Sequence, residues 1–218
     1  MPRQAVRIAA PAWPDAEFEN TLWQSGIKFV AGVDEAGRGA WAGPVTAAAV
    51  ILPSTCVKLS EILCGVRDSK LMTARQRSKW ALVIRQTALA ASSGWADVEE
   101  IDRLGIFQAT RLAMLRAVTG LHLPVDHLLI DAVVLKNIEI PQTNLIKGDA
   151  RCLSIAAASI IAKTERDHYM EFLEEKYPGY GFARHKGYGT RRHQEALIKI
   201  GISSVHRKSY APVKALLV

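Results

Sequence analysis

The sequence predicts an α/β protein in which helices cover a sheet of short strands. Apolar runs of strand length alternate along the chain with segments of helical periodicity, an order typical of layered α/β domains. The 218 residues are enough to bury one core. The longest apolar stretches, 45–52 and 153–162, are much shorter than the roughly 18 residues that suggest a membrane span. The N-terminus also lacks the apolar segment of a secretory signal, so we expect a cytoplasmic protein with no membrane contact.

The first half of the chain is expected to follow the order β-β-α-β-α. Thr73 and Gln76 have the spacing of a capping box, which marks the start of a helix, and Gly120 marks the end of another. The expected elements are strands at 28–34, 45–52 and 95–98 and helices at about 74–90 and 107–118.

The second half is expected to add two strands and two helices. Small residues in the segment 154–159 would let the longer helix approach a sheet closely, and Thr190 is a suitable N-cap for the last helix. The expected elements are strands at 127–130 and 144–146 and helices at about 150–176 and 191–200. We expect residues 1–26 to be an irregular N-terminal extension of unassigned role and residues 27–218 to form one domain.

Positive charge is concentrated in the last fifth of the chain. The formal net charge is +7, and the segment from about 176 to 218 holds a single acid, Glu195, together with three histidines and nine basic residues. These are Lys176, Arg184, Lys186, Arg191, Arg192, Lys199, Arg207, Lys208 and Lys214. A helical, basic C-terminal region predicts a surface for a polyanion such as a nucleic-acid backbone, although a basic solvated face explains the charge equally well.

The three cysteines, Cys56, Cys64 and Cys152, are scattered and form no CxxC motif. Neither a disulfide framework nor a structural zinc site is expected from them.

Four acids stand at the ends of expected core elements. Asp34 and Glu35 end the first strand before the glycine-rich turn, Asp131 ends a later strand, and Asp149 precedes the long helix. Sites in open α/β sheets gather outside the strand ends, so these carboxylates could share one site. Each acid also has an ordinary alternative: the pair could lie in a solvated turn, Asp131 in solvent, and Asp149 could be the N-cap of the helix. Asp167, four residues after Lys163, is expected to form a structural ion pair.

Four clustered carboxylates would need counter-ions, because buried unpaired charge is costly. Oxygen ligands suit Mg²⁺ or Mn²⁺, whereas zinc favours histidine and cysteine. Two such ions, about 3.5–4 Å apart, are the usual device for phosphoryl transfer by an activated water. A cluster of carboxylates with two such ions, next to a basic surface, predicts a nuclease.

The chain resembles ribonuclease HII from about Val30 to Tyr210. Many short motifs occur in one order, which is far more specific than any one of them. They are Asp34-Glu35-Ala36-Gly37-Arg38-Gly39, Ala42-Gly43-Pro44-Val45, Asp68-Ser69-Lys70, Leu129-Ile130-Asp131, Lys147-Gly148-Asp149, Ala156 to Lys163, Arg166-Asp167 and His185-Lys186-Gly187-Tyr188.

The resemblance implies a ribonuclease H-like fold with a mixed five-stranded sheet flanked by helices. It also implies an endonuclease that hydrolyses the RNA strand of RNA–DNA hybrids and cuts 5′ of single ribonucleotides embedded in duplex DNA, with a role in removing them. The products would carry 5′-phosphate and 3′-hydroxyl ends. By position, the metal-binding and catalytic acids would be Asp34, Glu35, Asp131 and Asp149, with Mg²⁺ or Mn²⁺ as two ions per site.

The resemblance also implies a set of substrate-binding residues. The turn Gly37-Arg38-Gly39 would contact the 2′-hydroxyl, the group that distinguishes RNA from DNA locally, and Tyr188 would pack on the deoxyribose that follows it. Arg38, Lys70 and Lys186 would contact phosphates, and Ser69 belongs to the same set.

Two positions depart from the family pattern: Trp41 replaces a smaller aliphatic residue, and Ala132 follows Asp131 where a glycine is common. Both bear on how the junction is recognised. The alternatives that remain are a metal-dependent nuclease for plain DNA or single strands and a non-catalytic RNA–DNA hybrid-binding protein. We expect a monomer.

Overall fold

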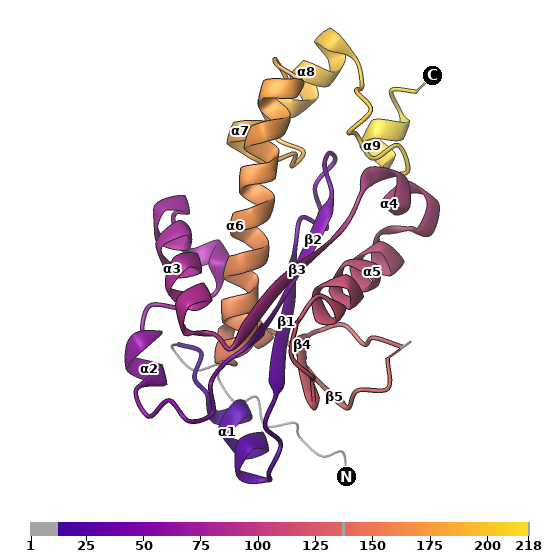
Figure 1. Cartoon of the computed structure of the whole chain (residues 1–218). Helices are drawn as coiled ribbons and strands as arrows, with labels where there is room; N and C mark the ends of the chain where they lie inside the picture. The colour runs from indigo at the N-terminus through magenta and orange to yellow at the C-terminus, as the bar shows by residue number, and fades with distance from the viewer. Residues whose placement is uncertain (1–12, 137, 218) are drawn as a thin grey trace, which may run out of the picture.

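The computed structural model describes residues 13–136 and 138–217. Its centre is a mixed five-stranded sheet, as the resemblance implied (Figure 1). The strands are β1 (Val30–Ala36), β2 (Val45–Ile51), β3 (Ala90–Ala96), β4 (His127–Asp131) and β5 (Gln142–Leu145), in the spatial order β3-β2-β1-β4-β5. The β1–β2 and β2–β3 pairs are antiparallel, whereas β4 runs parallel to β1 and to β5. The C-terminal ends of β1 and β4 therefore point to the same edge of the sheet.

Helices cover both faces of this sheet. The α-helices are α1 (Glu17–Gln24), α2 (Leu59–Ile62), α3 (Ala74–Thr87), α4 (Val98–Leu104), α5 (Ile106–Thr119), α6 (Leu153–Lys176), α7 (Phe182–His185), α8 (Arg191–Ile200) and α9 (Ala211–Lys214). Two short 3-10 turns, η1 (Ser69–Leu71) and η2 (Gly148–Ala150), complete the elements. Figure 1 shows α3 and α6 on one face of the sheet and α5 on the other.

The two faces pack separate apolar cores. One core joins α3 and α6 to β2 through side chains such as Ile84, Val50 and Ile160, and the other joins α5 to the sheet through Met114 and Ile130. The small-residue face of α6 lies directly on β1, as its sequence indicated. A Cβ atom added at Gly32 would overlap the backbone of Ser154, so this close approach requires a glycine.

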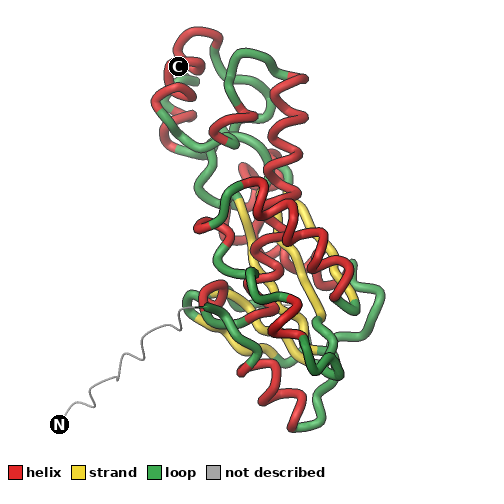
Figure 2. The backbone as a smooth tube through the Cα atoms, turned by 90° about the vertical axis from the view of Figure 1, so that its left-hand side faces the viewer, coloured by secondary structure: helices red, strands yellow, loops and turns green. Residues whose placement is uncertain are grey.

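The C-terminal helices lie at one end of the molecule, where α7 and α8 pack around the last turns of α6 and α9 lies beside α4 (Figures 1 and 2). Their core holds Met170, Leu173, Phe182 and Leu197. The C-terminal region is therefore helical, as expected, but it encloses a core of its own.

The strongest local signals in the sequence are confirmed. Thr73 and Gln76 form both hydrogen bonds of a capping box at the start of α3. Thr190 accepts a hydrogen bond from the backbone N–H of His193 at the start of α8. The strands expected at 45–52 and 127–130 and the helix expected at 107–118 agree with β2, β4 and α5 within about one residue at each end.

Several expectations are wrong in detail. Residues 17–24 are not irregular, since they form α1, whose Phe18 and Leu22 pack on the sheet and α6. The strand expected at 95–98 begins at Ala90, and Val98 already starts α4. The long helix begins at Leu153 rather than 150.

No helix in the described part of the chain is both long and apolar enough to span a membrane.

Candidate active site

Asp34 and Glu35 both lie within β1, which continues to Ala36 instead of turning at the acids. Consecutive residues of a strand point to opposite faces, so the two carboxylates leave the sheet on different sides. Asp34 is 3% exposed on the α6 face, and its Oδ1 accepts a hydrogen bond of 2.7 Å from the backbone N–H of Glu35. Ser159 of α6 lies close enough to lower the pKa of the Asp34 carboxyl against the larger effect of burial. Glu35 lies toward the α5 face and pairs with Arg38, whose Nη1 is 3.1 Å from Glu35 Oε1.

Asp131 and Asp149 approach the same edge from neighbouring segments. Asp131 ends β4, the parallel neighbour of β1, and its Oδ1 accepts a hydrogen bond of 2.7 Å from the backbone N–H of Gly148. Asp149 is buried in η2, and its Oδ2 lies 3.1 Å from Lys70 Nζ. The alternative role of Asp149 as the N-cap of the long helix is wrong, because that position belongs to Cys152.

The pKa values of three of these acids show that they form one electrostatic unit. Burial, and then repulsion from Glu35 and Asp131, raises the pKa of Asp34 well above its ordinary value. Burial also raises the pKa of Glu35, against the lowering effect of Arg38. The pKa of Asp131 is raised by burial and by Asp149, against the hydrogen bond from Gly148. Each ionised carboxylate therefore disfavours its neighbours, which is the condition that a bound cation relieves.

The donor set fits a hard divalent cation. Glu35 Oε2 is buried and finds no hydrogen-bond partner among the described residues, so one carboxylate oxygen is left for a ligand. Among the described residues, no group of three Asp, Glu, His or Cys side chains is placed closely enough to hold a metal ion. Lys70 and Arg38 instead neutralise Asp149 and Glu35. Carboxylate oxygens without histidine or cysteine match Mg²⁺ or Mn²⁺.

The turn after β1 is built around its glycines. Gly37 has φ +92°, and a Cβ atom there would overlap the side chain of Arg166. At Gly39 no described atom lies within 4 Å of the position of an added Cβ. The turn thus keeps open space beside its backbone at the edge that carries the acids.

Two buried arginines hold this turn, and the sequence analysis missed their role. Arg166 donates to the carbonyls of Ala42, Pro44 and Lys186, and Arg207 donates to those of Arg38, Gly43 and Pro44. Both residues are 0% exposed.

The interpretation of Arg207 as a surface charge is therefore wrong. The same holds for His185, His193 and His206, which are buried as well. The only sequence feature that singled out Arg166 was its place beside Asp167 in a motif. The hydrogen bonds from its guanidinium group to backbone carbonyls can be recognised only in the structure.

Tyr188 lies at the surface of the C-terminal region, 36% exposed, on the loop after α7. The centroid of its ring is 5.6 Å from Lys163 Nζ and from Arg166 Cζ. Because Arg166 also touches the Gly37 turn, it connects Tyr188 with the turn. Trp41 packs over Gly189, where a Cβ atom would overlap the indole, so this departure from the family pattern joins the same two loops.

Ser69 and Lys186 are placed differently from the other predicted contacts. Ser69 is 3% exposed and its hydroxyl lies 2.9 Å from that of Ser159, the residue that lowers the pKa of Asp34. Ser69 is therefore beneath the acids rather than on their open side. Lys186 Nζ pairs with Glu171 at 2.6 Å, away from the acids. Asp167 forms its expected pair with Lys163 at 2.7 Å and a second one with Arg77 at 2.8 Å.

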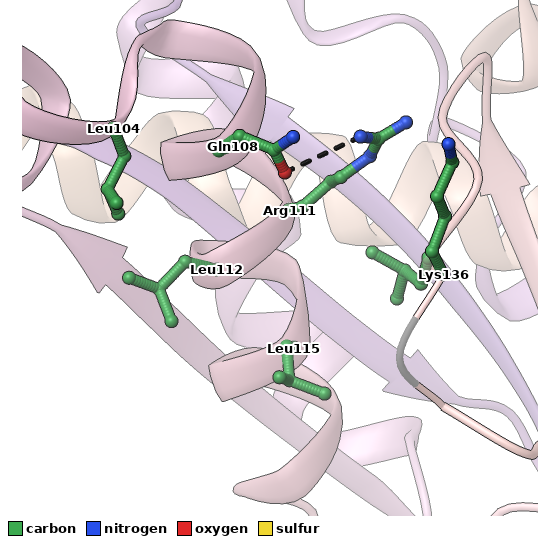
Figure 3. Close-up of a pocket in the computed structure, with 7 residues that line it drawn as sticks. Leu104, Gln108, Arg111, Leu112, Leu115 and Lys136 are labelled. Atoms are coloured by element: carbon green, nitrogen blue, oxygen red, sulfur yellow. Dashed lines mark hydrogen bonds between the residues drawn. The ribbon is translucent and has the colours of Figure 1, made fainter.

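A separate groove of about 420 Å³ lies between α5 and the loop after β4 (Figure 3). Leu104, Leu112 and Leu115 lie along one side of it, and the head groups of Arg111 and Lys136 lie on the other. It contains none of the predicted site residues.

The sheet order, the two helical layers and the acids at the shared strand ends define an α/β protein of the ribonuclease H-like class. The family model of Ribonuclease HII matches residues 31–213. Ribonuclease HII of Roseiflexus castenholzii is 52% identical over 92% of this chain and 89% of its own length. That of Chloroflexus aurantiacus is 49% identical over 94% of this chain and 97% of its own length. The crystal structure of ribonuclease H2 from Pyrococcus horikoshii superposes with a TM-score of 0.76 at 27% identity and covers 86% of this chain and 96% of that one.

The chain belongs to the ribonuclease HII family. It is accordingly an endonuclease that hydrolyses RNA in RNA–DNA hybrids. This assignment sets aside the alternative of a non-catalytic hybrid-binding protein.

Proposed function

We propose that this enzyme cuts duplex DNA on the 5′ side of single embedded ribonucleotides, as well as the RNA strand of hybrids, and leaves 5′-phosphate and 3′-hydroxyl ends. The observation that carries the proposal is the set of four carboxylates beside an open glycine turn, with the buried oxygen Glu35 Oε2 left without a partner among the described residues.

In this proposal Asp34, Glu35, Asp131 and Asp149 would hold two Mg²⁺ or Mn²⁺ ions. Asp34, which interacts electrostatically with all three other acids, would be the ligand that both ions share. Glu35 and Asp131 would each complete the ligand set of one ion, and Asp149 would serve the side of the attacking water. Two such ions, when bound, activate water and stabilise the leaving oxygen of a phosphodiester. Lys70 stays protonated, because Asp149 raises its pKa above the ordinary value although burial opposes this, and it is free to move from Asp149 to a phosphate.

Recognition of the ribonucleotide is assigned to the Gly37-Arg38-Gly39 turn and to Tyr188. The backbone of the turn can come close to a 2′-hydroxyl, since no side chain covers Gly39 in the described structure. Tyr188 offers an aromatic face that packs on a deoxyribose without reading a base. Arg166, which touches both the turn and the Tyr188 ring, sets the distance between the two contacts.

The exposed basic residues of the C-terminal region supply the phosphate contacts that position the duplex. They are Lys176, Arg184, Arg191, Arg192, Lys199, Lys208 and Lys214.

The variant Asp34→Asn tests the proposal. It keeps the size of the side chain and removes the charge that two cations need, so cleavage is expected to fall by at least about 100-fold while duplex binding stays largely intact. The measurement is a single-turnover cleavage assay beside a binding titration with the same labelled duplex. Glu61→Gln, at an exposed acid on α2, is the matched control and is expected to cleave as the wild type does. Full activity of the Asp34→Asn enzyme would overturn the metal-site assignment.

A further inference from the structure

Three histidines lie in the core of the C-terminal region and have no role in the function proposed above. His185, His193 and His206 are 9%, 0% and 0% exposed. The rings of His185 and His193 stack with centroids 4.5 Å apart, and Phe182 packs edge-on against both. Buried histidines are expected to be neutral and to satisfy both ring nitrogens.

The hydrogen bonds of His193 and His206 fix the position of each proton. His193 Nδ1 lies 3.0 Å from the carbonyl oxygen of Tyr188, which can only accept, so this nitrogen carries a proton. His193 Nε2 is then an acceptor, and His206 Nε2, 3.0 Å away, donates to it. His206 Nδ1 in turn accepts from the backbone N–H of Ser203 at 3.0 Å. One neutral tautomer of each ring therefore satisfies all the hydrogen bonds from Ser203 through His206 and His193 to Tyr188.

A second proton on either ring is disfavoured by this chain of hydrogen bonds. On His193 it would face the N–H of His206. On His206 it would face the N–H of Ser203, and only the Ser203 hydroxyl, 2.8 Å from Nδ1, could accept it. In agreement with this geometry, burial lowers the pKa of both His193 and His206 to about 4. Both rings are therefore neutral donors at physiological pH.

This chain of hydrogen bonds ends at Tyr188, the residue that we propose to contact the RNA–DNA junction. The Tyr188 carbonyl accepts from His193 and also from the backbone N–H of Thr190 at 2.8 Å. The N–H of Tyr188 donates to the His185 carbonyl at 2.9 Å. His193 is the only side chain within the described residues that hydrogen-bonds to the Tyr188 backbone.

We infer that His206 and His193 are positioning residues, which hold the Tyr188 backbone so that its ring meets the deoxyribose at an RNA–DNA junction. The inference rests on the proposed role of Tyr188 and adds the residues that place it. If the Tyr188 ring is already held in place, it loses less conformational entropy when the substrate binds. The two histidines should therefore affect substrate affinity.

Four variants separate the hydrogen bonds from the packing. His193→Leu removes the donor to Tyr188, whereas His193→Asn places an amide N–H at the position of Nδ1. His206→Leu removes the donor to His193, whereas His206→Gln keeps an N–H at the position of Nε2. Thermal unfolding and binding of an all-DNA duplex show that each variant is folded.

Each variant is assayed on a DNA duplex with one ribonucleotide and on a uniform RNA–DNA hybrid, which offers no deoxyribose after the cut. On the first substrate, His193→Leu is expected to raise KM by about threefold to tenfold, the factor for one net hydrogen bond, with little change in kcat. His206→Leu is expected to act in the same direction. The Asn and Gln variants, and all four variants on the hybrid, are expected to remain within about twofold of wild type.

The double variant with Tyr188→Ala is the decisive control. If the histidines act through the ring, His193→Leu has no further effect once the ring is gone. An equal loss on both substrates, or a loss that persists in the Tyr188→Ala background, would overturn the inference and leave the proposed function standing. A Tyr188→Ala enzyme that cuts the junction substrate as well as the wild type would instead overturn the role of Tyr188 itself.

Discussion

At the scale of single residues, the acids of the candidate site lower the stability of the folded protein. Asp34 is buried beside two other carboxylates, and its pKa is raised by burial and by their repulsion. An acid whose folded pKa is raised above its unfolded value costs stability once it is ionised. The carboxylate that we propose as the shared cation ligand thus destabilises the fold when no cation is bound.

We predict that Asp34→Asn stabilises the metal-free protein at pH 7, because it removes an ionised carboxylate that burial and the neighbouring acids disfavour. The gain is expected to be on the order of 1 kcal/mol, the usual size of a single-substitution effect. This gain in stability should shrink as the pH falls below the raised pKa of Asp34, because the wild-type carboxyl then becomes protonated in the folded state. Urea unfolding in chelator at several pH values measures this. A less stable variant at pH 7 would contradict the electrostatic description of the site.

Ala132 carries a different kind of strain. It follows Asp131 with φ +50°, in the left-handed region that favours glycine, the residue that the resemblance led us to expect there. We predict that Ala132→Gly stabilises the protein by about 0.5 kcal/mol, the left-handed cost of alanine less the extra freedom of glycine in the unfolded chain. Thermal unfolding measures the change, and a destabilised glycine variant would show that the strain is absent.

Side-chain placements were predictable from sequence where they follow from a strand, as for Asp34 and Asp131 near the C-terminal ends of the parallel strands β1 and β4. They were not predictable where the partner comes from a distant segment. Asp149 had the sequence of an N-cap, yet it pairs with Lys70, 79 residues earlier. Arg207 had the sequence of a surface charge, yet it binds carbonyls of residues more than 160 positions away.

At the scale of elements, α1 completes the start of α6. Glu19 of α1 is 0% exposed, and its Oε1 accepts from the backbone N–H of Ser154 at 2.7 Å and from the thiol of Cys152 at 3.1 Å. Cys152 itself, at the N-cap position, makes no side-chain cap. The carboxylate of one helix thus caps another, at a favourable place for negative charge. Residues 17–24 therefore stabilise the helix that carries Ser159.

We predict that Glu19→Ala lowers the free energy of unfolding by about 1–3 kcal/mol, because it leaves the Ser154 N–H buried without an acceptor. Glu19→Gln keeps an acceptor oxygen and is expected to lose less. Glu17→Ala, on the exposed side of the same helix, should change stability by no more than about 0.5 kcal/mol. Equal losses in the Glu17→Ala and Glu19→Ala proteins, measured by urea unfolding, would argue against the cap.

Elements with complete local signals were predicted well, as α3 and α8 show. The helix α4 was missed although Asp97 and Glu100 form a capping box in the structure, because the apolar pattern of its seven residues is too short to detect. The strand β3 was placed too late, since its Ala-Ala-Ser-Ser sequence has little strand character and is held by pairing with β2.

At the scale of the whole molecule, the C-terminal segment closes over the turn that follows β1. Arg207 and the Tyr210 hydroxyl both donate to the carbonyl of Arg38, and Arg207 also holds Gly43 and Pro44. The two ends of the described chain thus meet different parts of one site: α1 supports α6, and the C-terminal segment supports the glycine turn.

We predict that Arg207→Lys destabilises the protein by about 3 kcal/mol and lowers kcat on both substrates, because an ammonium group cannot reproduce the planar fork of donors in a buried site. Arg103→Lys, an exposed change on α4 outside the C-terminal region, is the control and should leave both unchanged. The measurements are thermal unfolding and steady-state cleavage. Wild-type activity in a folded Arg207→Lys enzyme would show that the turn does not need this support.

The central claim is that four carboxylates and a glycine turn together make a metal-dependent enzyme that recognises one 2′-hydroxyl. The most direct measurement is cleavage of a DNA duplex with a single internal ribonucleotide, beside an all-DNA duplex and an RNA–DNA hybrid, with Mg²⁺, with Mn²⁺ and with chelator. We predict a cut 5′ of the ribonucleotide that is lost in chelator, and no cut in all-DNA. Cleavage of all-DNA, or cleavage that persists in chelator, would contradict the account.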